Sequence, residues 1–319
     1  MFGNRIGWGI SLGMVVVFAA LMWLFVELGR LSPPTRFSQD AVLNQPIALP
    51  VSPDTIYQAN QPGDAGPIYR RAIDVYNANR SQYEELAREP KPDLNARIPA
   101  IDALLEAAPL REMQLFERSP GDALAYTMRE TADLQTLVKI GELANRLALF
   151  HASGGNKQRA TQLFEAVFAL GDKLFKERVS YAELSSGMGL MAAAAEGMQR
   201  RVATEEQKPR LAAFLDGYRT HRTVLQDIQK RINSIDSRIS YRHVGDVYYI
   251  IRTPSIDRMW RAEALMKAGR YRFDAGRAAD QRGALRVIQP FLDDPDPVLR
   301  HAATKATDLT LFEYRRLGS

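Results

Sequence analysis

A run of twenty-one uncharged residues, 6–26, limits the folds open to this chain more than any other feature. As a helix it would be about 31 Å long, because each residue adds about 1.5 Å, and this length matches a hydrocarbon core of about 30 Å. The run is longer than the apolar core of a cleavable signal, and no small-x-small cleavage site follows it. We therefore predict a short tail over 1–5 and a retained transmembrane helix over 6–28.

Five residues within this run have roles that a membrane setting suggests. Trp8 and Trp23 lie fifteen positions apart, so one indole is expected at each membrane interface. Gly9 and Gly13 form a small-residue pair that lets another helix approach closely, and the Ser11 hydroxyl can donate an interhelical hydrogen bond. The alternative is that glycine is simply frequent in membrane helices.

Flanking charges leave the orientation of this anchor nearly balanced, since Arg5 lies before it and Arg30 and Arg36 lie after it. A short tail that stays inside, with a large exported domain, is the usual arrangement of an amino-terminal anchor. The chain has no cysteine, which suits an oxidising compartment. We expect an inner-membrane protein with a cytoplasmic amino terminus and a periplasmic or extracytoplasmic domain. A reversed anchor with a cytoplasm-facing adaptor is the alternative.

The remainder of the chain shows helical periodicity nearly throughout. After a proline-bearing segment, 29–62, predicted to be an extended tether, apolar residues recur at spacings of three and four, as at Ile68, Ala72 and Val75. The pattern predicts an all-α fold, with a helical domain over 63–237 and carboxyl-terminal helices over 255–319.

Two details of the helical domain can be predicted more closely. The segment "YAELSSGMGLMAAAAEGMQRRVA" has a face of small residues, including Gly187 and Gly189, which suits close packing between helices. The following segment has Pro209 near its start, and proline is tolerated in the first turn of a helix. We therefore predict that this helix begins near Lys208.

Two segments resemble known helical repeats. "LANRLALFHASGGNKQRATQLFEAVFALG", Leu143 to Gly171, resembles a tetratricopeptide-type hairpin. "RGALRVIQPFLDDPDPVLRHAATKATDL", Arg282 to Leu309, resembles one HEAT-type unit. Each repeat of such families buries its core only against its neighbours. Both resemblances imply antiparallel helix pairs stacked into an irregular α-solenoid or bundle, a class that generally holds other proteins.

One segment, 238–254, departs from the helical pattern. It reads "RISYRHVGDVYYIIRTP" and is rich in β-branched and aromatic residues, which favours a short strand pair or a loop. A structural connector and a surface that contacts a partner are both open interpretations. The candidate contact residues are Arg238, Tyr241, Arg242, Tyr248, Tyr249 and Arg252.

The sequence shows no pattern that supports catalysis or cofactor binding. The four histidines lie far apart and form no metal-binding pair, and the lack of cysteine excludes thiolate metal sites within the chain. Neither a phosphate-binding G-x-x-x-x-G-K-[ST] loop nor a G-x-S-x-G nucleophile elbow occurs. We therefore expect no catalytic, metal or cofactor site, although an envelope hydrolase whose acidic residues converge only in the fold is an open alternative.

Charge is distributed unevenly along the chain. Residues 199–272 carry 16 Lys and Arg against 8 Asp and Glu, while 37–198 carry 16 against 21. The basic region could meet anionic lipid head groups or an acidic protein surface, or it could be the solvated side of two helices. Taken together, the sequence predicts a non-catalytic scaffold or accessory subunit of a larger membrane assembly, with other membrane subunits as partners and no nucleic acid.

Overall fold

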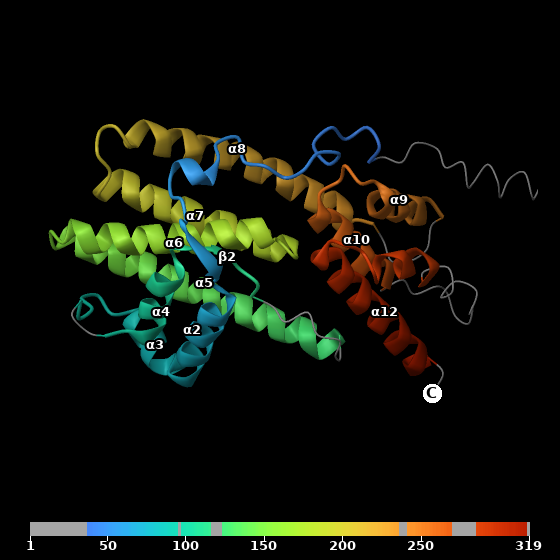
Figure 1. The fold of residues 1–319 in the computed structure, drawn as a ribbon, viewed down its shortest axis with the longest axis horizontal. Coiled ribbons are helices and arrows are strands. Elements are labelled where there is room, and N and C mark those ends of the chain that lie inside the picture. The colour runs from blue at the N-terminus through green and yellow to red at the C-terminus, as the bar shows by residue number, and fades with distance from the viewer. Residues whose placement is uncertain (1–36, 95–96, 116–122, 236–240, 270–284, 318–319) are drawn as a thin grey trace, which may run out of the picture.

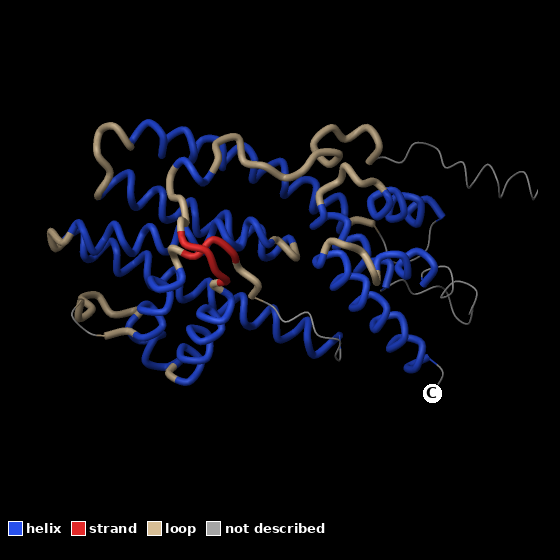
Figure 2. Tube along the Cα trace, in the orientation of Figure 1, coloured by secondary structure: helices blue, strands red, loops and turns tan. Residues whose placement is uncertain are grey.

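The computed structural model describes residues 37–94, 97–115, 123–235, 241–269 and 285–317, and these are mostly helical (Figures 1 and 2). The prediction of an all-α fold is therefore confirmed. Two single-turn 3-10 helices, η1 (Pro53–Thr55) and η2 (Gln289–Phe291), and two short strands, β1 (Gln61–Asp64) and β2 (Leu110–Glu112), accompany the α-helices. The α-helices are α2 (Gly66–Ala78), α3 (Arg80–Leu86), α4 (Pro99–Ala107), α5 (Ala123–Ser153), α6 (Lys157–Glu177), α7 (Tyr181–Arg201), α8 (Lys208–Asn233), α9 (Tyr241–Arg252), α10 (Arg258–Gly269) and α12 (Pro297–Leu317).

Helices α5 to α8 form the body of the molecule as successive antiparallel layers (Figure 1). Gly155 makes the turn between α5 and α6 with a φ of +86°, a left-handed conformation that glycine adopts without strain. Asn156 then caps α6 by accepting a hydrogen bond from the Arg159 N–H at 3.1 Å. Lys208 begins α8 with Pro209 in its first turn, as the sequence predicted.

Helices α6 and α7 approach so closely that two glycines face each other. A Cβ added to Gly187 would lie 2.6 Å from the Gly171 carbonyl oxygen, and the reverse distance is also 2.6 Å. Any side chain at either position would therefore clash with backbone. The predicted small face of α7 is confirmed at Gly187, whereas Gly189 faces open space.

A smaller unit, α2 to α4, packs on one side of this body. Its strands β1 and β2 pair in parallel (Figure 2), and the Asp64 carboxylate accepts hydrogen bonds from the Gly66 and Gln114 N–H groups, each at 2.8 Å. The side chain of Asp64 thus fixes the start of α2 against the end of β2. Tyr69, Tyr76 and other residues of α2 are buried in the core.

The carboxyl-terminal unit consists of α9, α10 and α12, and it meets the body at α5 and α7 (Figure 1). Helix α9 occupies most of the segment 238–254, so the predicted strand pair or loop is corrected to a helix. The reason lies in burial: Val247, Ile250 and Ile251 are fully buried and lie on one helical face. Packing of this face outweighs the weak strand preference of β-branched residues.

Residues 37–57, here called the strap, lie along the surface of the molecule and follow α8 (Figure 1). Phe37, Leu43 and Ile47 are buried with at most 7% of their surface exposed. Most of the segment predicted as an extended tether, 29–62, is therefore packed onto the helices from residue 37 onward.

Polar contacts fasten the strap at several points along its length. The Tyr249 hydroxyl donates to Asn44 Oδ1 at 2.7 Å, and Lys176 pairs with Asp54 at 3.0 Å. The strap thereby ties together α6 and α9, which belong to different units. Further contacts join Asp40 to Arg231 and place Pro50 against Gly217.

Candidate functional site

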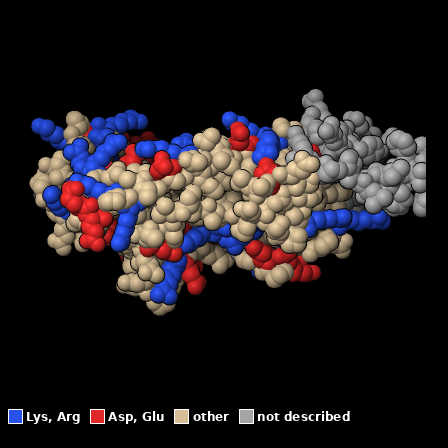
Figure 3. Space-filling view, turned by 90° about the horizontal axis from the view of Figure 1, so that it is seen from above, with Lys and Arg blue, Asp and Glu red and all other residues tan. Residues whose placement is uncertain are grey.

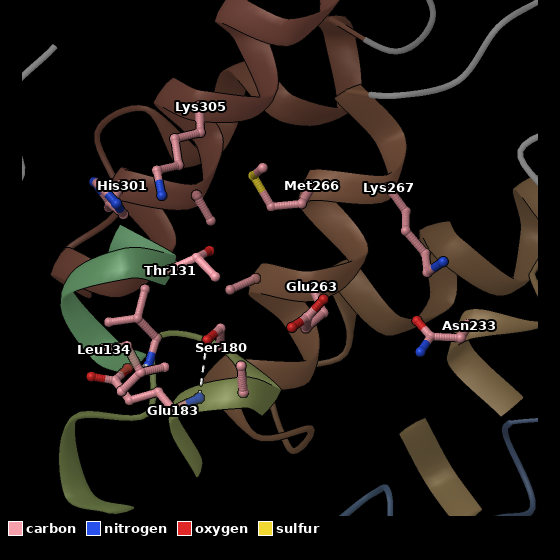
Figure 4. Close-up of a pocket in the computed structure, with 14 residues that line it drawn as sticks. Thr131, Leu134, Ser180, Glu183, Asn233, Glu263, Met266, Lys267, His301 and Lys305 are labelled. Carbon is pink, nitrogen blue, oxygen red and sulfur yellow. Dashed lines mark hydrogen bonds between the residues drawn. The ribbon is translucent and has the colours of Figure 1, made fainter. Parts of the chain in front are cut away.

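A cavity of about 260 Å³ lies where α5, α7, α10 and α12 meet (Figure 4). It is called the junction cleft below, because its walls come from both the body and the carboxyl-terminal unit. Five ionisable residues line it: Glu183, Glu263, Lys267, His301 and Lys305.

The wall from α7 is built around the amino terminus of that helix. Ser180 caps α7 by accepting a hydrogen bond from the Glu183 N–H at 3.3 Å. The Glu183 carboxylate reaches back and accepts from the Val179 N–H at 2.5 Å. This arrangement resembles a capping box, in which Ser and Glu three residues apart satisfy the first free N–H groups of a helix.

The opposite walls come from α10 and α12. Glu263 accepts a hydrogen bond from the Tyr181 N–H at 3.0 Å and so joins α10 to the first turn of α7. His301 and Lys305 lie one turn apart on α12, with only 6% and 7% of their surfaces exposed. Figure 4 shows both side chains on the same side of the cleft, across from Glu183 and Ser180.

The hydrogen bonds of Ser180, Glu183 and Glu263 make the junction cleft a polar joint between two helical units. Ser180 accepts a backbone hydrogen bond, and both carboxylates accept backbone N–H groups at the start of α7. These groups therefore satisfy the end of a helix, which would cost free energy if left buried without partners. No cluster of three potential metal ligands occurs among the described residues.

A second buried polar cluster fastens the strap to the carboxyl-terminal unit. Asp257 accepts hydrogen bonds from the Ile47 N–H and the Met259 N–H, both at 3.0 Å. Arg178 donates to the same carboxylate at 2.9 Å. The side chain of Asp257 is 2% exposed and that of Arg178 is 16% exposed, so this ion pair is shielded from water.

Arg178 holds an unusual backbone conformation at the end of α6, with a φ of +26°. Such a conformation is uncommon for a residue with a side chain. The contacts of its guanidinium with Asp257 and with the Phe175 carbonyl at 3.0 Å hold it in place.

Burial of Asp257 raises the pKa of its carboxyl group, but the hydrogen bond and charge of Arg178, with the two backbone donors, outweigh it and lower the pKa overall. Because the pKa of Asp257 is lower in the folded protein than the value of about 3.9 in the unfolded chain, its carboxylate stabilises the fold at pH values above about 3.9. This contribution is lost as the pH falls through the folded pKa.

We therefore expect the free energy of unfolding to decrease as the pH is lowered from about 5 to about 3. Denaturant titrations of the full chain in detergent at several pH values measure this decrease. In Asp257→Asn the decrease should be shallower, because the titrating carboxylate is gone. An equally steep decrease in the variant would contradict the assignment.

Another buried ionisable group, Lys173, connects α6 to the unit formed by α2 to α4. It is 3% exposed, and its ammonium donates to the Ala108 carbonyl at 2.9 Å. Burial lowers its pKa to about 8. One carbonyl does not fully replace hydration of an ammonium group, which explains the direction of this shift.

The residues predicted to act within the membrane, Trp8, Gly9, Ser11, Gly13 and Trp23, lie outside the described residues. Within the part of the chain that the structure describes, no helix is both long and apolar enough to span a bilayer.

The predicted partner-contact residues fall into four groups. Arg238 lies outside the described residues, and Tyr241 and Arg242 begin α9. Tyr249 is occupied by its hydrogen bond to the strap. The Arg252 guanidinium lies 5.6 Å from the ring centre of Tyr248; Tyr248 is partly buried against the core, and Arg252 is exposed.

Sequence reasoning missed the residues of the junction cleft and the pair of Arg178 with Asp257. Cleft residues come from five helices, α8 included through Asn233, and their positions in the chain run from 131 to 305, so no local spacing marks them. One signal was present: Ser180 and Glu183 have the spacing of a capping box before an apolar helix.

Where the structure describes the basic region, over 199–235 and 241–269, several of its basic side chains pair with acidic ones. Arg231, Arg219 and Arg258 are engaged with Asp40, Glu196 and Asp296. Figure 3 shows basic and acidic side chains interspersed over the face that carries α8. The excess charge is therefore partly used in contacts within the molecule.

These features define a class: an all-helical protein of stacked antiparallel helices, joined at a polar cleft and bound along one side by its own amino-terminal strap. No known protein family, curated protein or solved structure gives a significant match to this chain.

Proposed function

We propose that the protein is a membrane-anchored, non-catalytic scaffold or accessory subunit that organises a larger membrane assembly. Residues 6–28 anchor it in the inner membrane, and the helical domain lies on the periplasmic or extracytoplasmic side. The host is a respiratory, photosynthetic, secretion or envelope-building complex. Its partners are other membrane subunits, with anionic lipid head groups as a second contact.

The observation that supports this proposal is the fastening of the strap. Because the strap is packed from Phe37 onward, only residues 29–36 separate the proposed anchor from the folded domain. Eight residues span at most roughly 30 Å when fully extended. The domain is thus held at the membrane surface with a limited range of orientations, which suits an organising role better than that of a freely moving domain.

The position of Phe37 also favours α9 as the helix nearest the membrane. Its neighbours on the strap contact Arg231 at the end of α8 and Tyr249 in α9. Arg252, at the end of this helix, is exposed, and its guanidinium lies 5.6 Å from the ring centre of Tyr248. This basic aromatic pair is suited to a partner subunit or to lipid phosphate.

The proposal is tested by gentle solubilisation of the full-length protein and identification of the chains that copurify. We expect a defined set of membrane subunits with the natural protein and a reduced yield with Arg252→Glu. Arg201→Glu, at the opposite end of the molecule, is the matched control. A monomer that copurifies with no other chain would refute the proposal.

Localisation has a separate test. A reporter fused at Ser319 should be active in the extracytoplasmic compartment, and deletion of 2–28 should release the protein from the membrane fraction. Activity of the reporter only in the cytoplasm would instead establish the reversed anchor and the cytoplasm-facing adaptor.

A further inference from the structure

A separate cavity of about 180 Å³ lies beneath the strap, between α6, the end of α7 and the start of α8. It is called the strap cavity below. Thr55 and Ile56 of the strap form one wall, and the other walls come from the three helices. Its volume is below the range of about 300 to 1,000 Å³ typical of drug-sized ligands. The cavity therefore fits only a small molecule.

Glu165 of α6 is among the residues that line the strap cavity. This residue is half-buried, and burial raises its pKa. Within the described chain, its carboxyl group makes no hydrogen bond and no ion pair. A carboxylate removed from water without a cationic partner is destabilised in its charged form, and a bound ammonium group would relieve this.

Arg210, an exposed residue in the first turn of α8, also lines the cavity and has the opposite charge. Its guanidinium makes no ion pair with any described residue, including Glu165. The cavity is therefore lined by an acid and a base that do not neutralise each other. An arginine guanidinium presents a planar fork of donors that matches a carboxylate.

Apolar side chains line the same cavity. Met198 and Leu211 are buried with 7% and 3% of their surfaces exposed, and Val202 and Ile56 add further apolar surface. Gln207, also at the cavity, uses its side-chain oxygen to accept a hydrogen bond from the Thr204 N–H at 3.0 Å. The wall thus offers one acid, one base and a small apolar surface.

We propose that the strap cavity binds a small zwitterion of the apolar α-amino-acid type. The ligand's ammonium group lies at Glu165, its carboxylate lies at Arg210, and its side chain packs on Met198, Val202 and Leu211. This binding goes beyond the scaffold role and does not depend on it. Because Thr55 and Ile56 form one wall, bound ligand also holds the strap against the helices.

The test uses leucine as the probe in isothermal titration with the purified full-length protein in mild detergent. We expect saturable binding that weakens at least tenfold in Glu165→Gln and in Arg210→Gln. Glu142→Gln and Arg219→Gln, which change the same residue types at exposed positions away from the cavity, should bind leucine like the natural protein. Circular dichroism of each variant establishes that it is folded.

Two analogues separate the contributions of the two charges. Leucinamide lacks the carboxylate, so its binding should be weaker and insensitive to Arg210→Gln. 4-Methylpentanoate lacks the ammonium group, so its binding should be insensitive to Glu165→Gln. Leucine binding should also strengthen as the pH rises through the pKa of Glu165, since the ionised carboxylate is required.

Absence of leucine binding to the folded natural protein would overturn the proposal. Binding that survives both Glu165→Gln and Arg210→Gln would place the ligand elsewhere and would also overturn it. Neither result bears on copurification of membrane subunits, so failure of this inference and failure of the scaffold proposal are distinguishable.

Discussion

Replacing Gly187 by valine is expected to prevent stable folding of the helical body. The new Cβ would lie 2.6 Å from the Gly171 carbonyl oxygen and 2.8 Å from the Phe175 backbone nitrogen. Backbone cannot rotate away as a flexible side chain can, so α6 and α7 would have to separate along their contact. We expect a loss of at least about 3 kcal/mol, at or beyond the upper end of overpacking effects.

Denaturant unfolding of the full chain, followed by circular dichroism, measures this loss. Gly189→Ala is the control. Gly189 lies two residues from Gly187 on the same helix, and nothing lies within 4 Å of a Cβ added there. Alanine there should stabilise the protein by about 0.5 to 1 kcal/mol through its higher helix propensity. Equal free energies of unfolding for the two variants would contradict the close approach of α6 and α7.

Replacement of Asp257 by alanine should produce the second large effect. It leaves the buried guanidinium of Arg178 without a counter-charge and removes the acceptor of the Ile47 N–H. Breaking a buried ion pair by removing one partner typically costs about 3 to 5 kcal/mol. We also expect the strap to become sensitive to proteases, because its central fastening is lost.

Limited proteolysis with mass mapping, together with denaturant unfolding, checks both expectations. The control is Glu84→Gln, which removes an exposed pair with Lys139 whose side chains are 35% and 46% exposed. Exposed ion pairs contribute little to stability because water and salt screen them, so this variant should unfold almost like the natural protein. Cleavage of the strap at equal rates in both variants would contradict the proposed fastening.

Much of the helical framework could be predicted from sequence because apolar spacing is a local property. The start of α8 at Lys208 followed from Pro209, and the close packing of α7 followed from Gly187. Helix α9 was missed because its composition favours a strand, while its helical face shows only in the spacing of Val247, Ile250 and Ile251. Burial of that face decided the outcome.

The sites were beyond sequence reasoning for a different physical reason. Asp257 and the Ile47 N–H lie 210 residues apart in the chain. Neither residue type predicts such a contact. Likewise, Glu165 and Arg210 reach the strap cavity from different helices. Groups that meet only through tertiary packing leave no period or spacing in the sequence.

The order of synthesis gives the strap a further significance. Ile47 leaves the ribosome 210 residues before Asp257, the residue that accepts its N–H. At about 5 to 20 residues per second, this interval is roughly 10 to 40 seconds. During that time Phe37, Leu43 and Ile47 have no completed surface to pack on. Closure of the strap is therefore a late event, and a nascent chain that stalls before α10 would display these apolar residues to chaperones and proteases.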